Sequence, residues 1–359
     1  MRRAAFVLVT LAAVVATFAL PAPVLTASVA APAPVHLFWA NYIGGSIGRA
    51  NLNGTGVDEA FVGAGDGPCG VAVYGGHIYW GEEHGEAIGR ANLNGTGVDL
   101  NFISAGVSAV AAAAGGGPCG VAVYGGNIYW TDCCGSGDSI GRANLSGTGV
   151  EPKFITGLYE PAGGGPEGVA VGAGHIYWAN WSFSVPMTTI GRANLDGTHV
   201  DQKFVTGANN PGMVSIGAGH LDWTNSGPWT SGQIVHTTIG RANLDGTDVD
   251  ENFITGTDDS VGLVIYGGYV YWANYGNDVG TTIGRAKLPS ERELRWGCSL
   301  SLTDHVFGRA DRRTANHCLR RLRLPPYETW AHRCRTLASA PRAASRSAGP
   351  PLAFRGEAS

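Results

Sequence analysis

Apolar and small residues alternate with polar residues in short segments that recur along residues 36–289. The clearest set is "GVAVY" at residues 120–124, "NIYWTD" at 127–132, "SIGRANL" at 139–145 and "KFITG" at 153–157. Alternation over about five positions is the signature of a half-buried β-strand. Each set therefore predicts four β-strands.

Short glycine-rich segments separate the predicted strands. "YGGN", "YGGH" or "GAGH" stands between the first and second strands, and "NGTG" or "DGTD" stands between the third and fourth. Such Gly and Asn/Asp-Gly pairs tolerate the positive φ angles of tight hairpins, so neighbouring strands are expected to be antiparallel. The chain has 56 glycines in 359 residues, and their regular placement fits many tight turns.

One sequence phrase recurs along the chain. "SIGRANLNGTGVD" at residues 46–58 returns in close variants from residues 87, 139, 189 and 238, and "TIGRAKLPS" begins at residue 282. Each set also carries one tryptophan in its second strand: Trp39, Trp80, Trp130, Trp178, Trp223 and Trp272. Their spacing of 41 to 50 residues is close to the length of a four-stranded propeller blade. The sequence predicts an all-β, six-bladed β-propeller of four-stranded antiparallel blades, whose tryptophans pack between blades.

The repeats resemble a known family. "GPCGVAV" at residues 117–123, "IYWTD" at 128–132 and "IGRANLSG" at 140–147 are similar to the YWTD repeat of low-density-lipoprotein-receptor-type six-bladed β-propellers, in a form like that of secreted bacterial repeat proteins. The resemblance covers about residues 36–289. The Asp of the motif appears only as Asp132, and the equivalent places hold Asn41, Glu82, Asn180, Asn225 and Asn274. Since Asn also hydrogen-bonds to backbone, the resemblance implies a structural role for this position.

The ring is expected to lack two strands where it closes. Nothing like "GVAV" precedes the first set, and the last set stops after "TIGRAKL". One inner and one outer strand are therefore missing, whereas propellers normally complete a blade from both termini. An alternative is that "TASVAA" at residues 26–31 serves as a poor inner strand.

Residues 290–359 differ in kind from the repeats. They contain 13 Arg, no Lys and 6 acidic residues, a net charge of +7, whereas residues 1–289 carry a net charge of −11. Three interpretations stay open for this segment: a disordered basic tail, a small added module, or an out-of-frame continuation of the coding sequence.

The N-terminus has the layout of a secretory signal peptide. Two arginines precede an apolar run and a stretch of small residues, so residues 1–30 are expected to be removed and the mature chain to begin near Ala31. An uncleaved membrane anchor is the alternative. Either way, the repeats are expected outside the cell or on the exterior of the envelope, with no membrane span after cleavage.

The arginines of the repeats occupy one position. All six between residues 31 and 289 lie in the "IGRA" phrase: Arg49, Arg90, Arg142, Arg192, Arg241 and Arg285. A cationic ring for an anion is one interpretation. The other is that these residues hold the blades together, for example by bonding the Asn or Asp after a neighbouring tryptophan. A catalytic site normally breaks the symmetry of its repeat, which favours the structural role.

Other candidate chemistry is sparse. His77, His175 and His220 share a turn position with Asn127 and Tyr269, which argues against metal ligation. Cys69 and Cys119 occupy the same site in adjacent blades, where they are predicted to approach each other, but the seven cysteines do not define a pairing. There is no HExxH or P-loop sequence. No metal and no cofactor are expected.

Loops of variable length are expected to gather on one face. In a four-stranded blade, the second-to-third and fourth-to-first connections share a face, and here these segments differ most. The residues expected to bind a ligand there are Trp181, Phe183, Trp229, Tyr159, Tyr275, Glu82, Glu83 and Asp132. Aromatic and acidic groups suit a protein, peptide or carbohydrate partner, and the acidic ring disfavours nucleic acid. We expect a monomeric binding scaffold; the alternative is a hydrolase or lyase with its site in the central channel.

Overall fold

The chain divides into two compact units, Met1–Leu288 and Pro289–Ser359. The structure is a computed structural model, and it describes residues 11–13, 36–105, 116–133, 139–158, 164–182, 188–226, 229–230, 233–234, 237–275 and 282–288. All of these belong to the first unit, so the expectations for residues 290–359 lie outside the described residues. Among the described residues, no helix is long and apolar enough to cross a bilayer.

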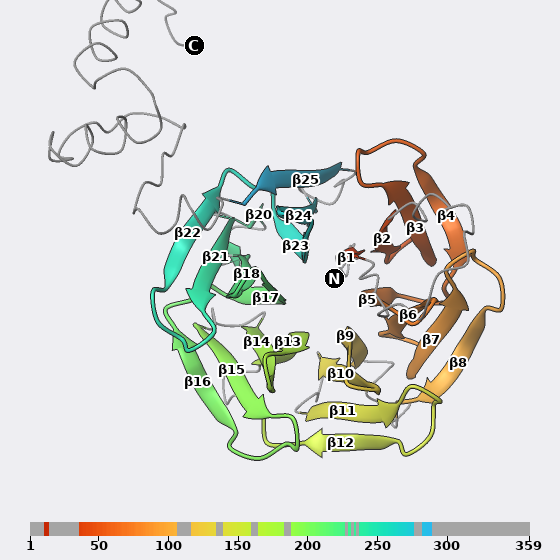
Figure 1. The fold of residues 1–359 in the computed structure, drawn as a ribbon, viewed down its shortest axis with the longest axis horizontal. Helices are drawn as coiled ribbons and strands as arrows, with labels where there is room; N and C mark the ends of the chain where they lie inside the picture. The colour runs from red at the N-terminus through yellow and green to blue at the C-terminus, as the bar shows by residue number, and fades with distance from the viewer. Residues whose placement is uncertain are drawn as a thin grey trace, which may run out of the picture. The chain divides into compact units, whose positions relative to one another are not determined.

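The first unit is a ring of six antiparallel sheets (Figure 1). Blade 1 contains β1 (Leu11–Ala13), β2 (His36–Asn41), β3 (Ser46–Asn51) and β4 (Asp58–Gly63). Blade 2 contains β5 (Pro68–Tyr74), β6 (His77–Glu82), β7 (Ala87–Asn92) and β8 (Asp99–Ser104). Blade 3 contains β9 (Gly117–Tyr124), β10 (Asn127–Cys133), β11 (Ser139–Asn144) and β12 (Glu151–Ile155).

The second half of the ring continues the pattern. Blade 4 contains β13 (Gly164–Gly172), β14 (His175–Ser182), β15 (Thr189–Asn194) and β16 (Asp201–Thr206). Blade 5 contains β17 (Pro211–Gly217), β18 (His220–Asn225), β21 (Thr238–Asn243) and β22 (Asp250–Thr255), and a separate hairpin of β19 (Trp229–Thr230) and β20 (Gln233–Ile234) precedes β21. Blade 6 contains β23 (Ser260–Tyr266), β24 (Tyr269–Asn274) and β25 (Thr282–Lys287). The prediction of an all-β, six-bladed β-propeller is confirmed.

The hydrophobic core lies between the blades. In one cluster, Phe38 and Ile47 of blade 1 pack with Val71 and Trp80 of blade 2. In another, Tyr129 and Ile140 of blade 3 pack with residues of blade 4. Each sheet thus covers its apolar face with the next sheet, which is why a single blade is not a stable unit.

The tryptophan of each blade packs on the glycine of the "IGRA" phrase. Trp130 on β10 pairs in register with Gly141 on β11. A Cβ added to Gly141 would lie 2.1 Å from the Trp130 ring, and the corresponding distance is 2.1–2.4 Å in every blade. Only glycine leaves room for the indole at this point, so the two residues are required together.

The arginine of the phrase stacks on an aromatic ring of its own blade. In blades 1 to 5, the guanidinium carbon lies 3.7–3.8 Å from the centre of a phenylalanine ring on the outer strand. The Asn after the tryptophan has other partners: Nδ2 of Asn180, for example, donates to Thr189 Oγ1 and to the Gln202 carbonyl. Among the described residues, the repeated Arg and the Asn after the tryptophan therefore do not bond to each other as expected. Each makes its own contacts within the blade.

The inner strand of blade 1 comes from the start of the chain. Strand β1 pairs with β2 and also contacts β5 and β23, so it completes the innermost ring of strands. The sequence-based alternative placed "TASVAA" in this position; this is wrong, because residues 11–13 occupy it instead. Strand β1 lies within the segment expected to be a signal peptide, and its pairing therefore requires an uncleaved chain.

The sixth blade is shorter than the others. Among the described residues its sheet has three strands, in the order β23-β24-β25, and no outer strand pairs with β25. This agrees with the outer strand that the sequence lacks after "TIGRAKL".

Candidate functional site

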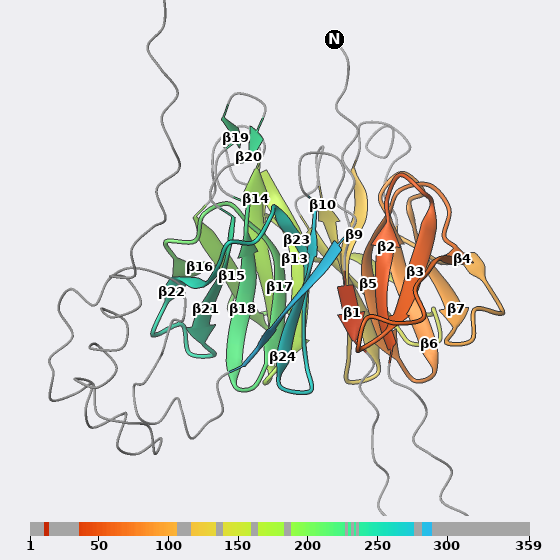
Figure 2. The ribbon, with the colours of Figure 1, turned by 90° about the horizontal axis from the view of Figure 1, so that it is seen from above.

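The two faces of the ring differ in their connections. On one face, tight hairpins such as those of β17–β18 and β23–β24 join first and second strands (Figure 2). On the other face the second strands end and the first strands begin, and the β19–β20 hairpin projects there (Figure 2). We call these the turn face and the loop face. The loop-face ends of the inner strands surround the mouth of the central channel.

A β-bulge shapes the loop-face end of each complete inner strand. In blade 2, Cys69 and Gly70 together oppose the single residue Gly81, between the pairs Pro68–Glu82 and Val71–Trp80. Bulges re-aim side chains and often lie beside functional sites. The same interruption occurs in β9, β13, β17 and β23. The bulge places equivalent residues of neighbouring blades close together.

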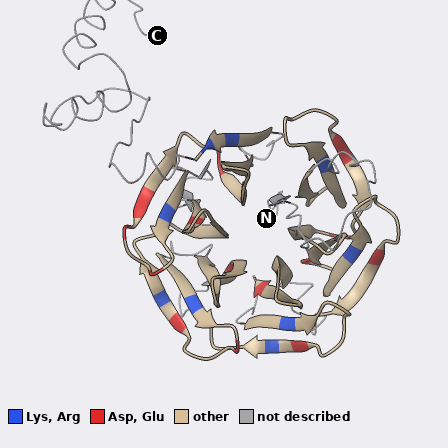
Figure 3. Ribbon diagram, viewed as in Figure 1, with Lys and Arg blue, Asp and Glu red and all other residues tan. Residues whose placement is uncertain are grey.

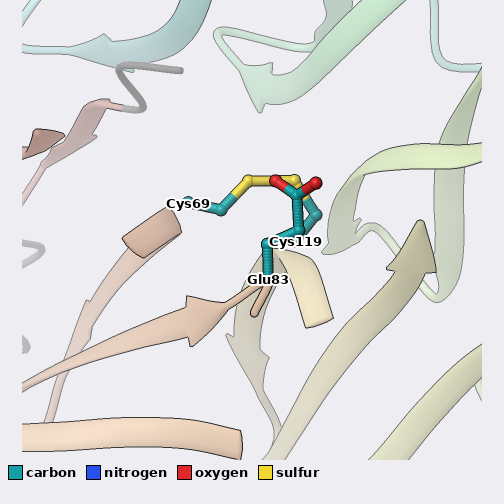
Figure 4. A group of neighbouring side chains, drawn as sticks. All are labelled: Cys69, Glu83 and Cys119. Atoms are coloured by element: carbon teal, nitrogen blue, oxygen red, sulfur yellow. A yellow bond between two sulfur atoms is a disulfide. The ribbon is translucent and has the colours of Figure 1, made fainter. Parts of the chain in front are cut away.

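The bulge residues of blades 2, 3 and 4 form a buried cluster. Cys69 and Cys119 are joined in a disulfide, so the predicted approach of these two cysteines is confirmed. Glu167 occupies the equivalent position in blade 4, and its Oε1 lies 3.6 Å from Cys119 Sγ. Glu83, which follows β6, points toward the disulfide (Figure 4). Cys133, a buried thiol at the end of β10, completes the group.

A threonine forms hydrogen bonds across the interface between blades 3 and 4, beside this cluster. Oγ1 of Thr131 accepts a hydrogen bond from the backbone N–H of Gly120 at 2.8 Å and donates to the backbone carbonyl of Glu167 in the next blade. Thr131 is fully buried. The position of Glu167 is therefore set by backbone contacts as well as by its side chain.

Burial changes the protonation of two carboxyl groups near the channel mouth. Burial, and to a smaller extent the nearby Glu83 carboxylate, raise the pKa of Glu167 to about 8, although a hydrogen bond with Cys133 opposes these effects. Burial likewise raises the pKa of Glu82 to about 7, although the Trp80 indole N–H donates a hydrogen bond to Glu82 Oε1 at 3.2 Å. At neutral pH, Glu167 is mainly protonated.

The buried cluster contains the groups that come closest to a metal-binding set. Ligand atoms of Cys69, Glu83 and Cys119, and of Cys119, Cys133 and Glu167, lie within 4.8 Å of one another. Two of the three sulfurs are joined in the disulfide, and a disulfide sulfur is not a thiolate ligand. In the oxidised chain, the disulfide therefore links blades 2 and 3 covalently, and Glu167 of blade 4 contacts it.

The central channel encloses a cavity of about 200 Å³. Its lining comes from the inner strands of blades 2 to 6 and consists of apolar residues and glycines, apart from Ser215. Val71, Val121, Val169 and Val214 occupy equivalent positions in this lining. These residues offer no acid, base or nucleophile for catalysis beyond the Ser215 hydroxyl.

A polar cluster of the exposed residues His84 and Asp66 and the half-buried Tyr42 lies on the loop face between blades 1 and 2. The Tyr42 hydroxyl lies 3.1 Å from Nε2 of His84, and the two rings meet edge to face. Nδ1 of His84 lies 3.5 Å from an oxygen of Asp66, whose side chain is 87% exposed. An aromatic ring, an imidazole and a carboxylate are thus available together to a ligand from solvent.

The structure places the predicted binding residues unevenly. Glu82, Glu83 and Tyr275 are buried, and Asp132 and Trp181 are half-buried at the loop-face ends of β10 and β14. Trp229 lies on β19, but its side chain is not described, and Phe183 and Tyr159 lie outside the described residues. Of the set, Glu83 joins the buried cluster with Glu167 and the cysteines.

The sequence patterns do not single out Glu167, Tyr42, His84 or Asp66. A signal for Glu167 was present, because "GPEGV" in blade 4 aligns with "GPCGV" in blades 2 and 3. The other three residues come from separate connections of two blades and form no contiguous motif.

Comparisons with known proteins agree on the fold and leave the activity open. Neither a protein-family model nor a curated protein matches this sequence. A chain of a nidogen/laminin complex is 22% identical, with a TM-score of 0.51 over 71% of this chain and 93% of that chain. Inactive virginiamycin B lyase from Staphylococcus aureus with quinupristin is 20% identical, with a TM-score of 0.50 over 72% and 78%. A gluconolactonase from Xanthomonas campestris is 14% identical, with a TM-score of 0.52 over 71% and 82%.

Proposed function

We propose that this propeller is a binding module that recognises a protein, peptide or carbohydrate through its loop face. The observation that carries the proposal is the polar cluster of Tyr42, His84 and Asp66. An aromatic ring offers a flat apolar surface, and the neighbouring imidazole and carboxylate offer directed hydrogen bonds. Such groups on loops over a rigid scaffold are typical of recognition sites.

The central channel gives less support to the alternative of a hydrolase or lyase. That activity would use acid or base groups at the axis, whereas the residues lining the cavity are apolar apart from Ser215 and glycines. The titratable groups near the channel mouth, which include Glu82, Glu83, Glu167 and Cys133, are buried. The similar solved structures include binding proteins and enzymes, so the site and not the fold decides between the two.

We also propose that the repeats belong to the YWTD class and that the module acts outside the cytoplasm as a monomer. The repeated "YWTD"-like strand and the "IGRA" phrase support the class. The apolar N-terminal segment after two arginines supports export.

The test is a binding screen of the full chain against arrays of glycans and extended peptides. A ligand of the loop face should bind the parent protein and bind the Tyr42→Ala, His84→Ala double variant at least about tenfold more weakly. Val249→Ser is the matched control, because Val249 is exposed on the turn-face side of blade 5. Equal binding by parent and double variant would contradict the proposal, as would an equal loss in the control.

A further inference from the structure

The outer strands of blades 1 to 5 share one sequence pattern and one register. Each has an acidic residue, two variable residues, a phenylalanine, and then Ile or Val; β22, for example, runs from Asp250 through Phe253 to Ile254. The acidic residue pairs with the repeated arginine: Arg49–Asp58, Arg90–Asp99, Arg142–Glu151, Arg192–Asp201 and Arg241–Asp250. The five outer strands therefore show which sequence pattern pairs with the outer edge of a third strand.

Blade 6 presents the same third strand without that partner. In Figure 3 the ribbon is blue at a basic residue on each third strand and red at an acidic residue on each outer strand of blades 1 to 5, whereas the charged residues of β25 are basic only. Among the described residues, no strand pairs with the outer edge of β25. An unpaired strand edge is a template for a further strand.

The arginine of blade 6 has surroundings different from those of its counterparts in blades 1 to 5. Arg285 is exposed, whereas its counterparts are half-buried or buried. Its guanidinium lies 4.9 Å from the Tyr269 ring, compared with 3.7–3.8 Å from phenylalanine in the other blades. It also donates a hydrogen bond to the Leu52 carbonyl of blade 1 at 3.1 Å. Among the described residues, no phenylalanine stacks on this exposed cation as it does on its counterparts.

The apolar residues beside Arg285 are also less covered than their counterparts. Ile283 is only partly buried, whereas the equivalent Ile47, Ile88, Ile140, Ile190 and Ile239 are fully buried. In the five complete blades this isoleucine pairs in register with an Ile or Val of the outer strand. No outer strand among those the structure describes offers Ile283 this partner, and the Ile or Val of the shared pattern would supply it.

We propose that the outer edge of β25 is a docking site for an extended segment of a partner protein with the pattern acid-x-x-Phe-(Ile/Val). The segment adds as an antiparallel fourth strand. Its phenylalanine stacks on Arg285, its carboxylate lies opposite the same guanidinium, and its Ile or Val covers Ile283. The charge of the ligand is set by the two cations of β25, Arg285 and Lys287. This site is separate from the loop-face cluster of blades 1 and 2.

The experiment titrates the full chain into a fluorescently labelled peptide, TDVDENFITG, which copies residues 247–256. Binding is followed by fluorescence anisotropy, and backbone protection by hydrogen exchange. We expect one peptide per chain and slower exchange in β25. A peptide with Phe replaced by Ala, and the protein variant Arg285→Ala, should each weaken binding at least about tenfold. Lys203→Ala removes an exposed cation from blade 4 and should leave binding unchanged.

Three results would overturn the proposal: no binding of the peptide, binding that neither change weakens, or protection that spares β25. Self-association of the chain with protection of β25, and no peptide binding, would show that a second copy is the occupant instead. The melting temperature of Arg285→Ala checks that the variant is folded. Failure of the loop-face variants in the glycan and peptide screen would leave this result unaffected, because Tyr42 and His84 lie on other blades.

Discussion

At the scale of single residues, the "IGRA" phrase is a set of four contacts. In blade 3, Ile140 and Ala143 are fully buried, Gly141 leaves room for Trp130, and Arg142 stacks on Phe154. Each letter of the phrase therefore has a separate physical reason.

The glycine contact predicts a large effect of one methyl group. Gly141→Ala should lower the free energy of unfolding by about 1–3 kcal/mol, because the new Cβ overlaps the Trp130 ring and the side chains around it must move. Denaturant unfolding followed by tryptophan fluorescence measures this effect. Gly63→Ala is the control, since nothing lies within 4 Å of the added Cβ. A loss of similar size in both variants would contradict the explanation.

Blade 5 replaces a neutral contact with a buried ion pair. Asp222 stands where Tyr79, Tyr129, Tyr177 and Tyr271 stand in other blades. Both of its oxygens accept hydrogen bonds from Arg241 at 2.7 Å, and both residues are buried. Removing one partner leaves the other charge uncompensated in a poorly solvated position.

The buried ion pair predicts that the loss of stability depends strongly on which residue replaces Asp222. Asp222→Ala should cost about 3–5 kcal/mol of unfolding free energy, whereas Asp222→Tyr restores the side chain used by other blades and should cost clearly less. Glu151→Ala, which breaks the exposed Arg142–Glu151 pair, should cost at most about 1 kcal/mol. Thermal unfolding of the three variants is the measurement, and equal losses for Asp222→Ala and Glu151→Ala would refute the prediction.

At the scale of elements, the repeated strands and turns were predictable, and the special strands were not. Alternation, hairpin glycines and tryptophan spacing identify the blades because each depends on residues close in sequence. Strand β1 was missed because "LAA" at residues 11–13 has no repeat pattern and is defined only by pairing with β2. The acidity of Glu167 was also inaccessible, because burial by residues of other blades determines it.

The bulge of β13 predicts a dependence of stability on pH. The pKa of Glu167 is raised from 4.5 to about 8 in the folded chain, so between these values the folded state holds a proton that the unfolded state has lost. The free energy of unfolding should therefore fall as pH rises from 4.5 to 8, by up to about 1.4 kcal/mol per pH unit from this group.

Urea unfolding of the parent protein and of Glu167→Gln across this pH range tests the effect. The variant should show a shallower fall, although some slope remains because burial also raises the pKa of Glu82. An unchanged slope would exclude Glu167 as its source.

At the scale of the whole molecule, ring closure depends on the chain's first residues. Strand β1 contacts blades 1, 2 and 6 through β2, β5 and β23, so removal of residues 1–30 opens the innermost ring of strands at one point. A chain that begins at Ala31 should lose about 2 kcal/mol or more, which corresponds to a melting temperature about 4–8 °C lower.

Differential scanning calorimetry of the two chains, with hydrogen exchange of β2, measures this loss. Faster exchange in β2 than in β10 of the shortened chain would locate the effect at blade 1. Identical melting and exchange in both chains would show that β1 contributes no stability.

The packing of each tryptophan on a glycine also bears on how the repeats change over time. Since a Cβ at Gly141 overlaps Trp130, a larger residue at position 141 is tolerated only after Trp130 has been replaced by a smaller side chain. That replacement, made first, leaves a void in the core. Divergence at this pair requires two substitutions, the first of which is harmful on its own. The glycine and tryptophan are therefore retained in each repeat. The loop-face connections carry no such constraint, so their sequences can diverge after duplication.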